Sequence, residues 1–242
     1  MLENKIVVVT GSAQGIGKHA AKTFAEHKAK VVIADFNEEL AKKTAAELGQ
    51  TTEALAARVD VREEESVKGL IDQVIDRFGQ IDVMINNAAI VPHFAWGIPR
   101  WPRIAEMPME FWERVIRTNL YGTFNGTKHA LPYMEKRRSG HIINLYGGGG
   151  LTPAGACAYM ASKDAIRAFT RYVAEEVREA NVCVVIFSPR VPIVTETAPA
   201  EAFKRLPGPE ILGEGFVLAA QLPMGESGKI FSYQNGKLVN EA

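Results

Sequence analysis

The chain has 242 residues, 47% hydrophobic and 23% charged, a composition typical of a globular protein with one large α/β domain or two small ones. Lysine plus arginine equals aspartate plus glutamate, with 28 of each. No basic excess is therefore available for nucleic-acid phosphates. The two cysteines, Cys157 and Cys183, give neither a disulfide framework nor a metal-binding spacing, so we expect no metal. We expect no membrane span, no signal peptide and a cytoplasmic location, because apolar runs are short and the first strand begins early.

A strand, a glycine-rich turn and a helical pattern open the chain. Residues 5–10 are mostly β-branched, which is typical of a strand buried in a parallel sheet. Gly11, Gly15 and Gly17 follow at once, and a helical pattern begins at Lys18. In this context the first glycine permits a tight turn, the second lets a pyrophosphate approach, and the third allows close helix packing. The turn predicts a dinucleotide site at a helix N-terminus, although a tight turn without a ligand is the alternative.

The second strand, residues 29–35, ends in Asp35. A carboxylate about 20 residues beyond such glycines can accept hydrogen bonds from the adenosine ribose, and it would repel a 2′-phosphate. No lysine or arginine lies in the glycine turn or directly beside Asp35. The sequence therefore favours NAD over NADP. Capping of the next helix by Asp35 or Asn37 is an alternative, and both roles can hold for different residues.

Strand and helix patterns alternate along the rest of the chain. This alternation predicts right-handed βαβ units in one α/β domain, residues 1–242, with a doubly wound parallel sheet. No linker, internal repeat or low-complexity segment divides it. The expected strands are 53–59, 81–85, 140–145, 181–188 and 228–232, and the expected helices are 38–48, 63–78, 109–136, 157–180 and 209–222.

Residues 91–108 interrupt this alternation. The stretch 91–102 holds three prolines and two tryptophans and has no helical period. It follows the carboxyl end of a strand, where ligands bind in such sheets, so an aromatic loop there could line a substrate pocket. Packing of the same loop on a neighbouring subunit is an equal alternative. His93 alone is no indication of catalysis.

Tyr159 and Lys163 lie four residues apart in the helix predicted at 157–180. This spacing places them on one helix face, with Cβ atoms roughly 5–6 Å apart. A free phenol titrates near ~10 and a free lysine near ~10.4. A fixed ammonium beside the phenol favours the phenolate and lowers the pKa of the tyrosine, so the pair is a plausible acid/base unit. Taken alone, an incidental pair on a surface helix is the more common explanation.

The ordered motifs resemble the short-chain dehydrogenase/reductase family over essentially the whole chain. The matching pieces are Thr10-Gly11-x-x-x-Gly15-x-Gly17, Asp60, Asn86-Asn87-Ala88, Asn119 and Tyr159-x-x-x-Lys163. The resemblance implies a single Rossmann-type domain with a parallel sheet of about seven strands. It also implies an NAD-dependent oxidoreductase that interconverts a secondary alcohol and a ketone by hydride transfer. A regulatory nicotinamide-binding member with weak or no redox activity and a member with non-redox chemistry are the alternatives.

The resemblance assigns roles to the matched residues. Tyr159 would be the general acid/base, while Lys163 would lower its pKa and hold the nicotinamide ribose. Asn119 would anchor a water that relays protons. A homotetramer or homodimer is also implied, with the helices at 109–136 and 157–180 forming an interface.

The cofactor contacts that follow are spread along the chain. Asp60 would meet the adenine beside the backbone of Val61, and Asn87 would lie near the adenosine-side ribose. The full set is Gly11, Ser12, Gln14, Gly15, Ile16, Gly17, Asp35, Phe36, Asp60, Val61, Asn87, Ala88, Ala89, Tyr159, Lys163, Pro189, Val191 and Thr195.

The chain departs from the family at the catalytic serine, which normally stands about thirteen residues before the tyrosine. Here Tyr146 or Gly147 takes that place, and no serine or threonine lies nearby. A developing alkoxide needs a second donor besides Tyr159. We therefore expect the hydroxyl of Tyr146 to replace the serine, with the substrate displaced toward the loop 91–102. The alternative is that Tyr146 only fills space beside that loop.

Other departures concern the cofactor. Ala89 stands where the family usually has glycine, which is a mild change. Pro189-Arg190 replaces the usual Pro-Gly after the sixth strand, and Thr195 falls one position later than the usual threonine. An arginine at this point could alter how the nicotinamide is seated.

Overall fold

One sheet of eight strands organises the computed structural model, which describes residues 2–93, 95, 97, 101–147 and 155–241. Within these residues the strand order is β3-β2-β1-β4-β5-β6-β7-β8. Neighbouring strands are parallel except β7 and β8, so the predicted doubly wound parallel sheet is confirmed. The strands are β1 (Ile6–Thr10), β2 (Lys30–Asp35), β3 (Ala54–Arg58), β4 (Val83–Asn86), β5 (Gly140–Leu145), β6 (Val182–Phe187), β7 (Ile230–Gln234) and β8 (Lys237–Asn240).

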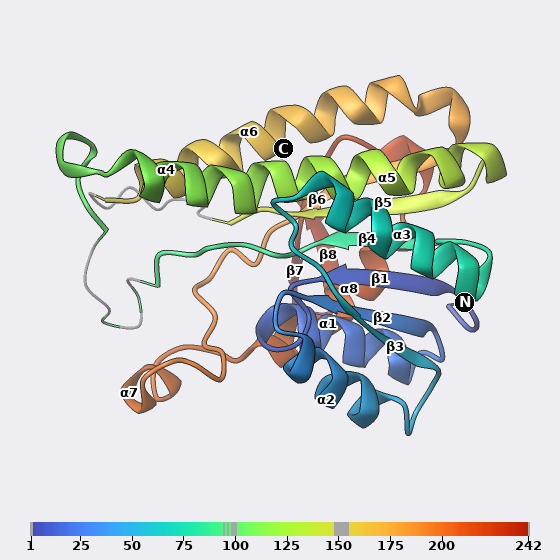
Figure 1. Ribbon diagram of the computed structural model, residues 1–242, viewed down its shortest axis with the longest axis horizontal. Helices are drawn as coiled ribbons and strands as arrows, with labels where there is room; N and C mark the ends of the chain where they lie inside the picture. Colours follow the sequence, from blue (N-terminus) through green and yellow to red (C-terminus); the bar gives the residue numbers. More distant parts are fainter. Residues whose placement is uncertain (1, 94, 96, 98–100, 148–154, 242) are drawn as a thin grey trace.

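Helices cover both faces of the sheet (Figure 1). The helices α1, α2 and α8 pack on one face, and α3, α5 and α6 pack on the other, so each face has its own apolar core. In β1, Val7 and Val9 enter the first core while Ile6 and Val8 enter the second, as expected for a strand buried on both sides. The helices are α1 (Gly15–Glu26), α2 (Glu38–Leu48), α3 (Glu64–Phe78), α4 (Met109–Ile116), α5 (Gly122–Arg137), α6 (Cys157–Glu176), α7 (Ala200–Phe203) and α8 (Gly213–Ala219).

The structure differs in detail from the sequence predictions, for example in the helix before β5 and in the number of strands. The helix expected at 109–136 is interrupted by a π-helical turn, Arg117–Tyr121, between α4 and α5. The sheet also has one strand more than the seven or so expected, because β8 folds back on β7 through Asn235 and Gly236. Both turn residues have left-handed φ angles, 50° and 80°, as a two-residue hairpin of type I′ requires.

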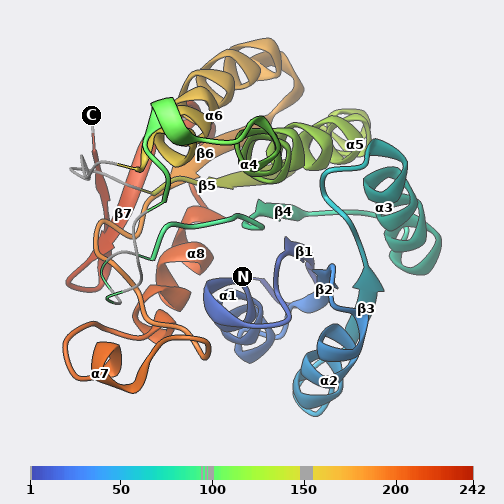
Figure 2. The same ribbon diagram turned by 60° about the vertical axis from the view of Figure 1, so that its left-hand side comes forward.

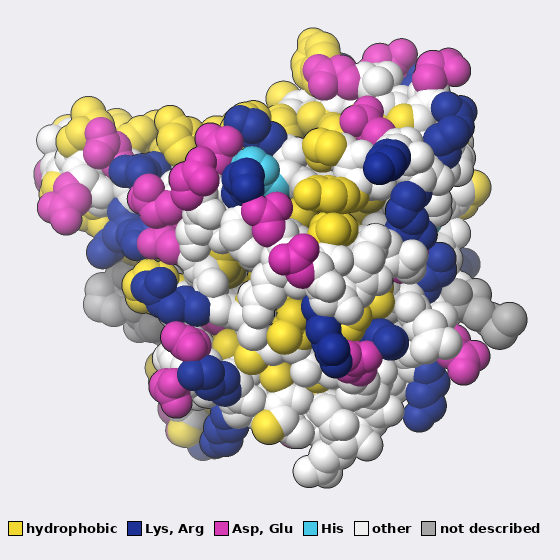
Figure 3. All heavy atoms as spheres, turned by 45° about the vertical axis from the view of Figure 1, so that its right-hand side comes forward, with side chains coloured by type: hydrophobic (Ala, Val, Ile, Leu, Met, Phe, Trp, Pro, Cys, Tyr) yellow, Lys and Arg dark blue, Asp and Glu magenta, His cyan; other side chains and the backbone are white. Residues whose placement is uncertain are grey.

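The carboxyl ends of the strands face one edge of the molecule, which Figure 2 turns toward the viewer. The loops that follow β1, β2, β4, β5 and β6 gather there, and α7 lies at the side of the same edge. Positive and negative side chains are mixed on the face shown in Figure 3. In the part of the chain that the structure describes, no helix is long and apolar enough to cross a bilayer.

Asp82 accepts several hydrogen bonds at the opposite, amino-terminal edge of the sheet. Its carboxylate is buried and accepts hydrogen bonds from the Ile6 backbone N–H and from Gln80, both at 2.8 Å. It also pairs with Lys5 Nζ at 3.1 Å and Arg137 Nη2 at 3.2 Å. Burial alone would raise the pKa of this carboxyl, but the donors outweigh burial and hold the pKa below its ordinary value.

We predict that Asp82→Asn lowers the free energy of unfolding by about 2–4 kcal/mol at pH 7, because two cations lose their buried partner. The pKa of Asp82 is lower in the folded than in the unfolded state, so its contribution is complete above the ordinary pKa of about 3.9. That contribution is lost as the pH falls further, and the difference between parent and variant should shrink. Urea unfolding at pH 7 and pH 3 measures both effects.

The matched control is Asp72→Asn, which removes an exposed partner of Lys68 and should cost no more than about 0.5 kcal/mol. A loss for Asp82→Asn as small as that of the control would contradict the role assigned to Asp82.

Candidate cofactor and active site

The glycine turn between β1 and α1 brings the helix unusually close to the sheet. Gly11 and Gly15 have φ angles of +63° and +62°, in the left-handed region that favours glycine. A Cβ on Gly17 would lie 2.5 Å from Nδ2 of Asn87 and would overlap the Gly11 carbonyl oxygen. The first N–H groups of a helix lack intrahelical acceptors, so this end of α1 is suited to an anion.

Asn87, the residue after β4, holds this turn through hydrogen bonds. Its Nδ2 donates to the carbonyl oxygens of Thr10 and Gly11, at 2.8 and 2.9 Å. Its backbone N–H donates to Thr10 Oγ1 at 3.1 Å. The amide therefore holds the glycine turn in place, and contact of Asn87 with a ribose stays a prediction.

A cavity of about 670 Å³ extends from the glycine turn to the start of α6, and its size is in the range of small-molecule and cofactor sites. It fits the implied dinucleotide, because Gly11 and Gly15 line one end of it, where the first N–H groups of α1 can donate to a pyrophosphate. Ser12 and Gly17 do not line it: the Ser12 hydroxyl donates to Val9 and accepts from the Ala34 N–H inside the sheet. The expected contacts that line it are Gly11, Gln14, Gly15, Ile16, Asp35, Phe36, Asp60, Val61, Asn87, Ala88, Ala89, Tyr159, Lys163, Pro189, Val191 and Thr195.

Asp35 and Asn37 divide the two roles proposed for them. The carboxylate of Asp35 accepts from the Ala13 and Asn37 backbone N–H groups, each at 3.0 Å, and lines the cavity. The side chain of Asn37 accepts from the Leu40 N–H at 3.0 Å and so caps α2. Helix capping thus falls to Asn37, and Asp35 remains at the cavity.

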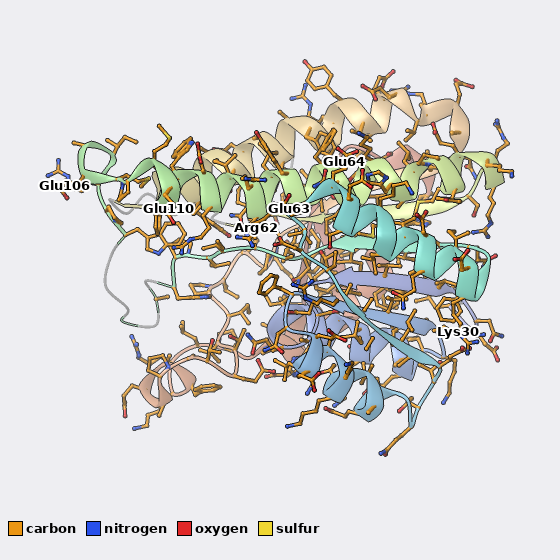
Figure 4. All side chains as sticks on the ribbon, in the orientation of Figure 1. Lys30, Arg62, Glu63, Glu64, Glu106 and Glu110 are labelled. Atoms are coloured by element: carbon orange, nitrogen blue, oxygen red, sulfur yellow. The ribbon has the colours of Figure 1, made fainter. Side chains whose placement is uncertain are left out.

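Two arginines near Asp35 were not predicted from the sequence. The guanidinium carbons of Arg58 and Arg62 lie 5.4 and 5.8 Å from the ring centroid of Phe36. Arg62 also donates to both carboxylate oxygens of Asp60, at 2.8 and 2.6 Å, and thereby holds the pKa of Asp60 below its ordinary value. In Figure 4, Arg62 lies toward the carboxyl-end edge of the sheet, far from Lys30 at the opposite end of β2. An adenine contact by Asp60 would therefore share its oxygens with Arg62.

Asn119 is fully buried in the π-helical turn and connects the loop after β4 to α6. Its side chain accepts from the Ile90 N–H at 2.8 Å and donates to the Ile90 carbonyl oxygen at 3.2 Å. It also donates to Ser162 Oγ at 3.0 Å, and Ser162 in turn donates to the carbonyl oxygen of Tyr159 at 2.6 Å. Asn119 thus positions the helical turn that carries Tyr159, and its water-anchoring role stays a prediction.

Tyr159 and Lys163 lie on one face of α6, and the ammonium lies over the tyrosine ring while it donates to the backbone. Lys163 Nζ donates to the Leu145 carbonyl oxygen at 2.7 Å and lies 5.7 Å from the centroid of the Tyr159 ring. Burial lowers the pKa of Lys163 to about 7. Burial, and then the nearby Tyr146, raise the pKa of Tyr159 well above its ordinary value. The expected lowering of the Tyr159 pKa is therefore not found, because burial is the largest effect on this phenol.

Gly147 faces the phenol where the resemblance places a serine. A Cβ on Gly147 would overlap the Tyr159 hydroxyl oxygen, so this backbone contact depends on glycine. Tyr146 lines the cavity, but its hydroxyl donates to Asp164 Oδ1 at 2.9 Å. A phenol has one proton, so donation to Asp164 and donation to a substrate oxygen exclude each other. Tyr146 as a donor to substrate stays a prediction that requires this hydrogen bond to break.

Arg190 has a left-handed φ of 61°, which explains why glycine suits this position. Its guanidinium pairs with Glu241, the residue after β8, at 3.2 Å. Arg190 therefore borders the cavity while its charge is paired with the carboxylate of Glu241.

One part of the loop after β4 lines the cavity, and another part packs on α4. Its first residues, 91–93, and Ala95 line the cavity, whereas Trp101 packs edge-on against Phe111 with centroids 5.0 Å apart. Residues 94, 96 and 98–100 of the predicted aromatic loop and the glycines at 148–150 lie outside the described residues.

Comparison with known proteins identifies the family. The family model for short chain dehydrogenases matches residues 5–203. The chain is 38% identical over 189 residues to momilactone A synthase of Oryza sativa subsp. japonica, an alignment that covers 78% of this chain and 66% of that protein. The chain thus spans slightly less than two thirds of that relative's length.

Two further proteins are similar over most of their length. The chain is 33% identical over 223 residues to the 3-oxoacyl-[acyl-carrier-protein] reductase FabG of Thermotoga maritima, which covers 85% of this chain and 84% of that protein. The solved 3-ketoacyl-(acyl-carrier-protein) reductase from Brucella melitensis, complexed with NADH, superposes with a TM-score of 0.83 at 25% identity and covers 98% and 99% of the two chains. This chain is therefore a member of the short-chain dehydrogenase family.

Proposed function

We propose that the protein is an NAD-dependent oxidoreductase that interconverts a secondary alcohol and a ketone by hydride transfer. The observation that carries this proposal is the single cavity that joins the glycine turn and Asp35 to Tyr159 and Lys163. The bound nicotinamide would supply or accept the hydride. The NADH complex of the Brucella melitensis reductase supports a nicotinamide cofactor. Val91, Pro92, Val191, Pro192 and Ile193 line the same cavity and favour a small or medium apolar substrate.

Tyr159 moves the proton to or from the substrate oxygen. Its raised pKa keeps the phenol protonated at neutral pH, which suits a general acid in ketone reduction. Alcohol oxidation requires the phenol to give up its own proton first, and a protonated Lys163 favours that state. Because the pKa of Lys163 is about 7, this lysine gains or loses its charge near neutral pH.

We predict that Tyr159→Phe lowers the rate by ~10²–10⁴ while the Kd for NADH stays within about twofold, because only the acid/base hydroxyl is removed. Steady-state rates with a panel of apolar secondary alcohols and NADH titration by fluorescence measure the two quantities. The control is Tyr172→Phe, an exposed tyrosine on the same helix, which should match the parent. Retention of most activity by Tyr159→Phe would remove Tyr159 from the mechanism.

A preference for NAD over NADP rests on the carboxylate of Asp35 at the cavity. One carboxylate–phosphate repulsion supplies ~1.4 kcal/mol, or about tenfold in affinity. Arg58 and Arg62 lie nearby and offset part of this repulsion, although Arg62 is already paired with Asp60. We therefore expect a preference of about tenfold rather than exclusion of NADP.

We predict that Asp35→Ser narrows the NAD/NADP affinity ratio by about tenfold, mainly through tighter NADP binding, because the repulsion is removed. Calorimetric titration of both cofactors measures the ratio. Glu39→Gln, an exposed carboxylate in the first turn of α2, is the control and should leave the ratio unchanged. A parent protein that binds NADP as tightly as NAD would refute the proposed preference.

The second candidate is a nicotinamide-binding member with weak redox activity and a regulatory role. The observation in its favour is that Gly147 brings no hydroxyl to Tyr159, while the Tyr146 proton is used by Asp164. A substrate oxygen then has one donor in place of two. The two candidates differ in whether Tyr146 can replace the missing donor.

Paired variants decide this question. If Tyr146 donates to substrate, Tyr146→Phe should lower the rate by ~10²–10³, since one oxyanion donor is lost. Asp164→Ala should then leave the rate unchanged or raise it, because the phenol proton of Tyr146 becomes free to bond the substrate oxygen. Equal losses in both variants would mean that the Tyr146–Asp164 hydrogen bond only supports the structure. A Tyr146→Phe enzyme as fast as the parent would favour the second candidate, the regulatory member with weak redox activity.

We also propose a homodimer or homotetramer in a cytoplasmic setting. Tyr121, in the π-helical turn, and Phe124, in α5, are exposed, and Phe124 contacts Phe169 of α6 edge-on at 6.2 Å, so an apolar helix face is available for a second copy. The two cysteines are free thiols, which suits a reducing compartment.

A further inference from the structure

The anion end of α1 is contacted by a carboxylate from far along the chain. The backbone N–H of Gly15 donates to Glu196 Oε2 at 2.9 Å, across 181 residues of sequence. The N-cap residue, Gln14, makes no side-chain capping hydrogen bond, and the first turn of α1 contains no acidic residue. Glu196 therefore supplies the negative charge that this helix end would otherwise lack.

The segment that carries Glu196 lies directly on the glycine turn. It connects β6 to α7, which Figure 2 shows beside the α1 side of the sheet. Thr195 Cγ2 is 3.1 Å from the position that a Cβ on Gly15 would occupy. Val194 is buried, and its N–H donates to the Pro207 carbonyl oxygen at 2.9 Å, which anchors the segment. Thr195, Thr197 and Gly15 line the cavity, so the hydrogen bond between Glu196 and Gly15 lies at the cavity wall.

A carboxylate and a pyrophosphate would compete for the same N–H donors. Among the residues that the structure describes, no lysine, arginine or histidine forms a salt bridge with Glu196. Lys18, near the start of α1, is paired with Glu47 at 2.8 Å. Two anions at this helix end would therefore repel each other without a cation between them.

We propose that Glu196 is a built-in competitor of the cofactor pyrophosphate, which occupies the anion end of α1 in the free protein and leaves when the dinucleotide binds. The inference rests on the proposed function. Only the fraction of protein in which Glu196 has left is competent to bind, so the apparent Kd equals the intrinsic Kd divided by that fraction. Glu196 thus sets the affinity for the cofactor.

The test compares the parent with Glu196→Gln, which keeps a hydrogen-bond acceptor but removes the charge. The matched control is Glu201→Gln, an exposed residue of α7 paired with Lys204, which changes the net charge equally. Each protein is titrated with NADH, ADP-ribose and adenosine. Glu196→Gln should bind NADH and ADP-ribose about three- to tenfold more tightly than the parent. Its affinity for adenosine, which has no phosphate, should be unchanged, and the control should match the parent.

Equal NADH affinity in the parent and Glu196→Gln would overturn the inference while leaving the proposed function intact. Equal tightening in Glu201→Gln, or equal tightening toward adenosine, would also overturn it, because the effect would then come from net charge. If none of the three proteins binds NADH or NADPH, the proposed function fails and the inference falls with it.

Discussion

The close contact between α1 and β1 is the constraint on which the rest of the site depends. No Cβ fits at Gly17, and Asn87, the residue after β4, donates hydrogen bonds to carbonyl oxygens of the same turn. The start of α1 and the ends of β1 and β4 are therefore held together at the carboxyl edge of the sheet. This arrangement leaves an open cavity above the turn and directs helix N–H groups to it, and Tyr159 closes its far end. A side chain larger than hydrogen at Gly17 would separate the helix from the sheet and remove both features.

The parts of this arrangement that local patterns encode could be predicted from the sequence. The β-branched run before Gly11, the spacing of the glycines and the four-residue separation of Tyr159 and Lys163 each depend on neighbours in the chain. Alternating strand and helix patterns likewise led to the doubly wound sheet. The eighth strand also had a local signal, Asn235-Gly236, which the sequence analysis did not use.

The remaining features depend on contacts that only the folded chain brings together. Nothing near Glu196 in the sequence indicates that its carboxylate meets Gly15. For a similar reason, the position and the pKa of the Lys163 ammonium could not be predicted from the local sequence. Spacing predicts which side chains share a helix face, but burial and the Leu145 carbonyl decide where the ammonium points and how it titrates.

In the proposed function, these contacts form a site that binds an anionic dinucleotide at one end and moves a proton at the other. The central claim is that hydride passes between the nicotinamide and a carbonyl carbon beside Tyr159. Its most direct test is transfer of deuterium from NADH that carries deuterium at both C4 positions of the nicotinamide to a panel of small apolar ketones, with the products identified by mass spectrometry. The account predicts a secondary alcohol with one deuterium on its carbinol carbon. Failure to form a deuterated alcohol from any ketone, by a protein that binds NADH, would contradict it.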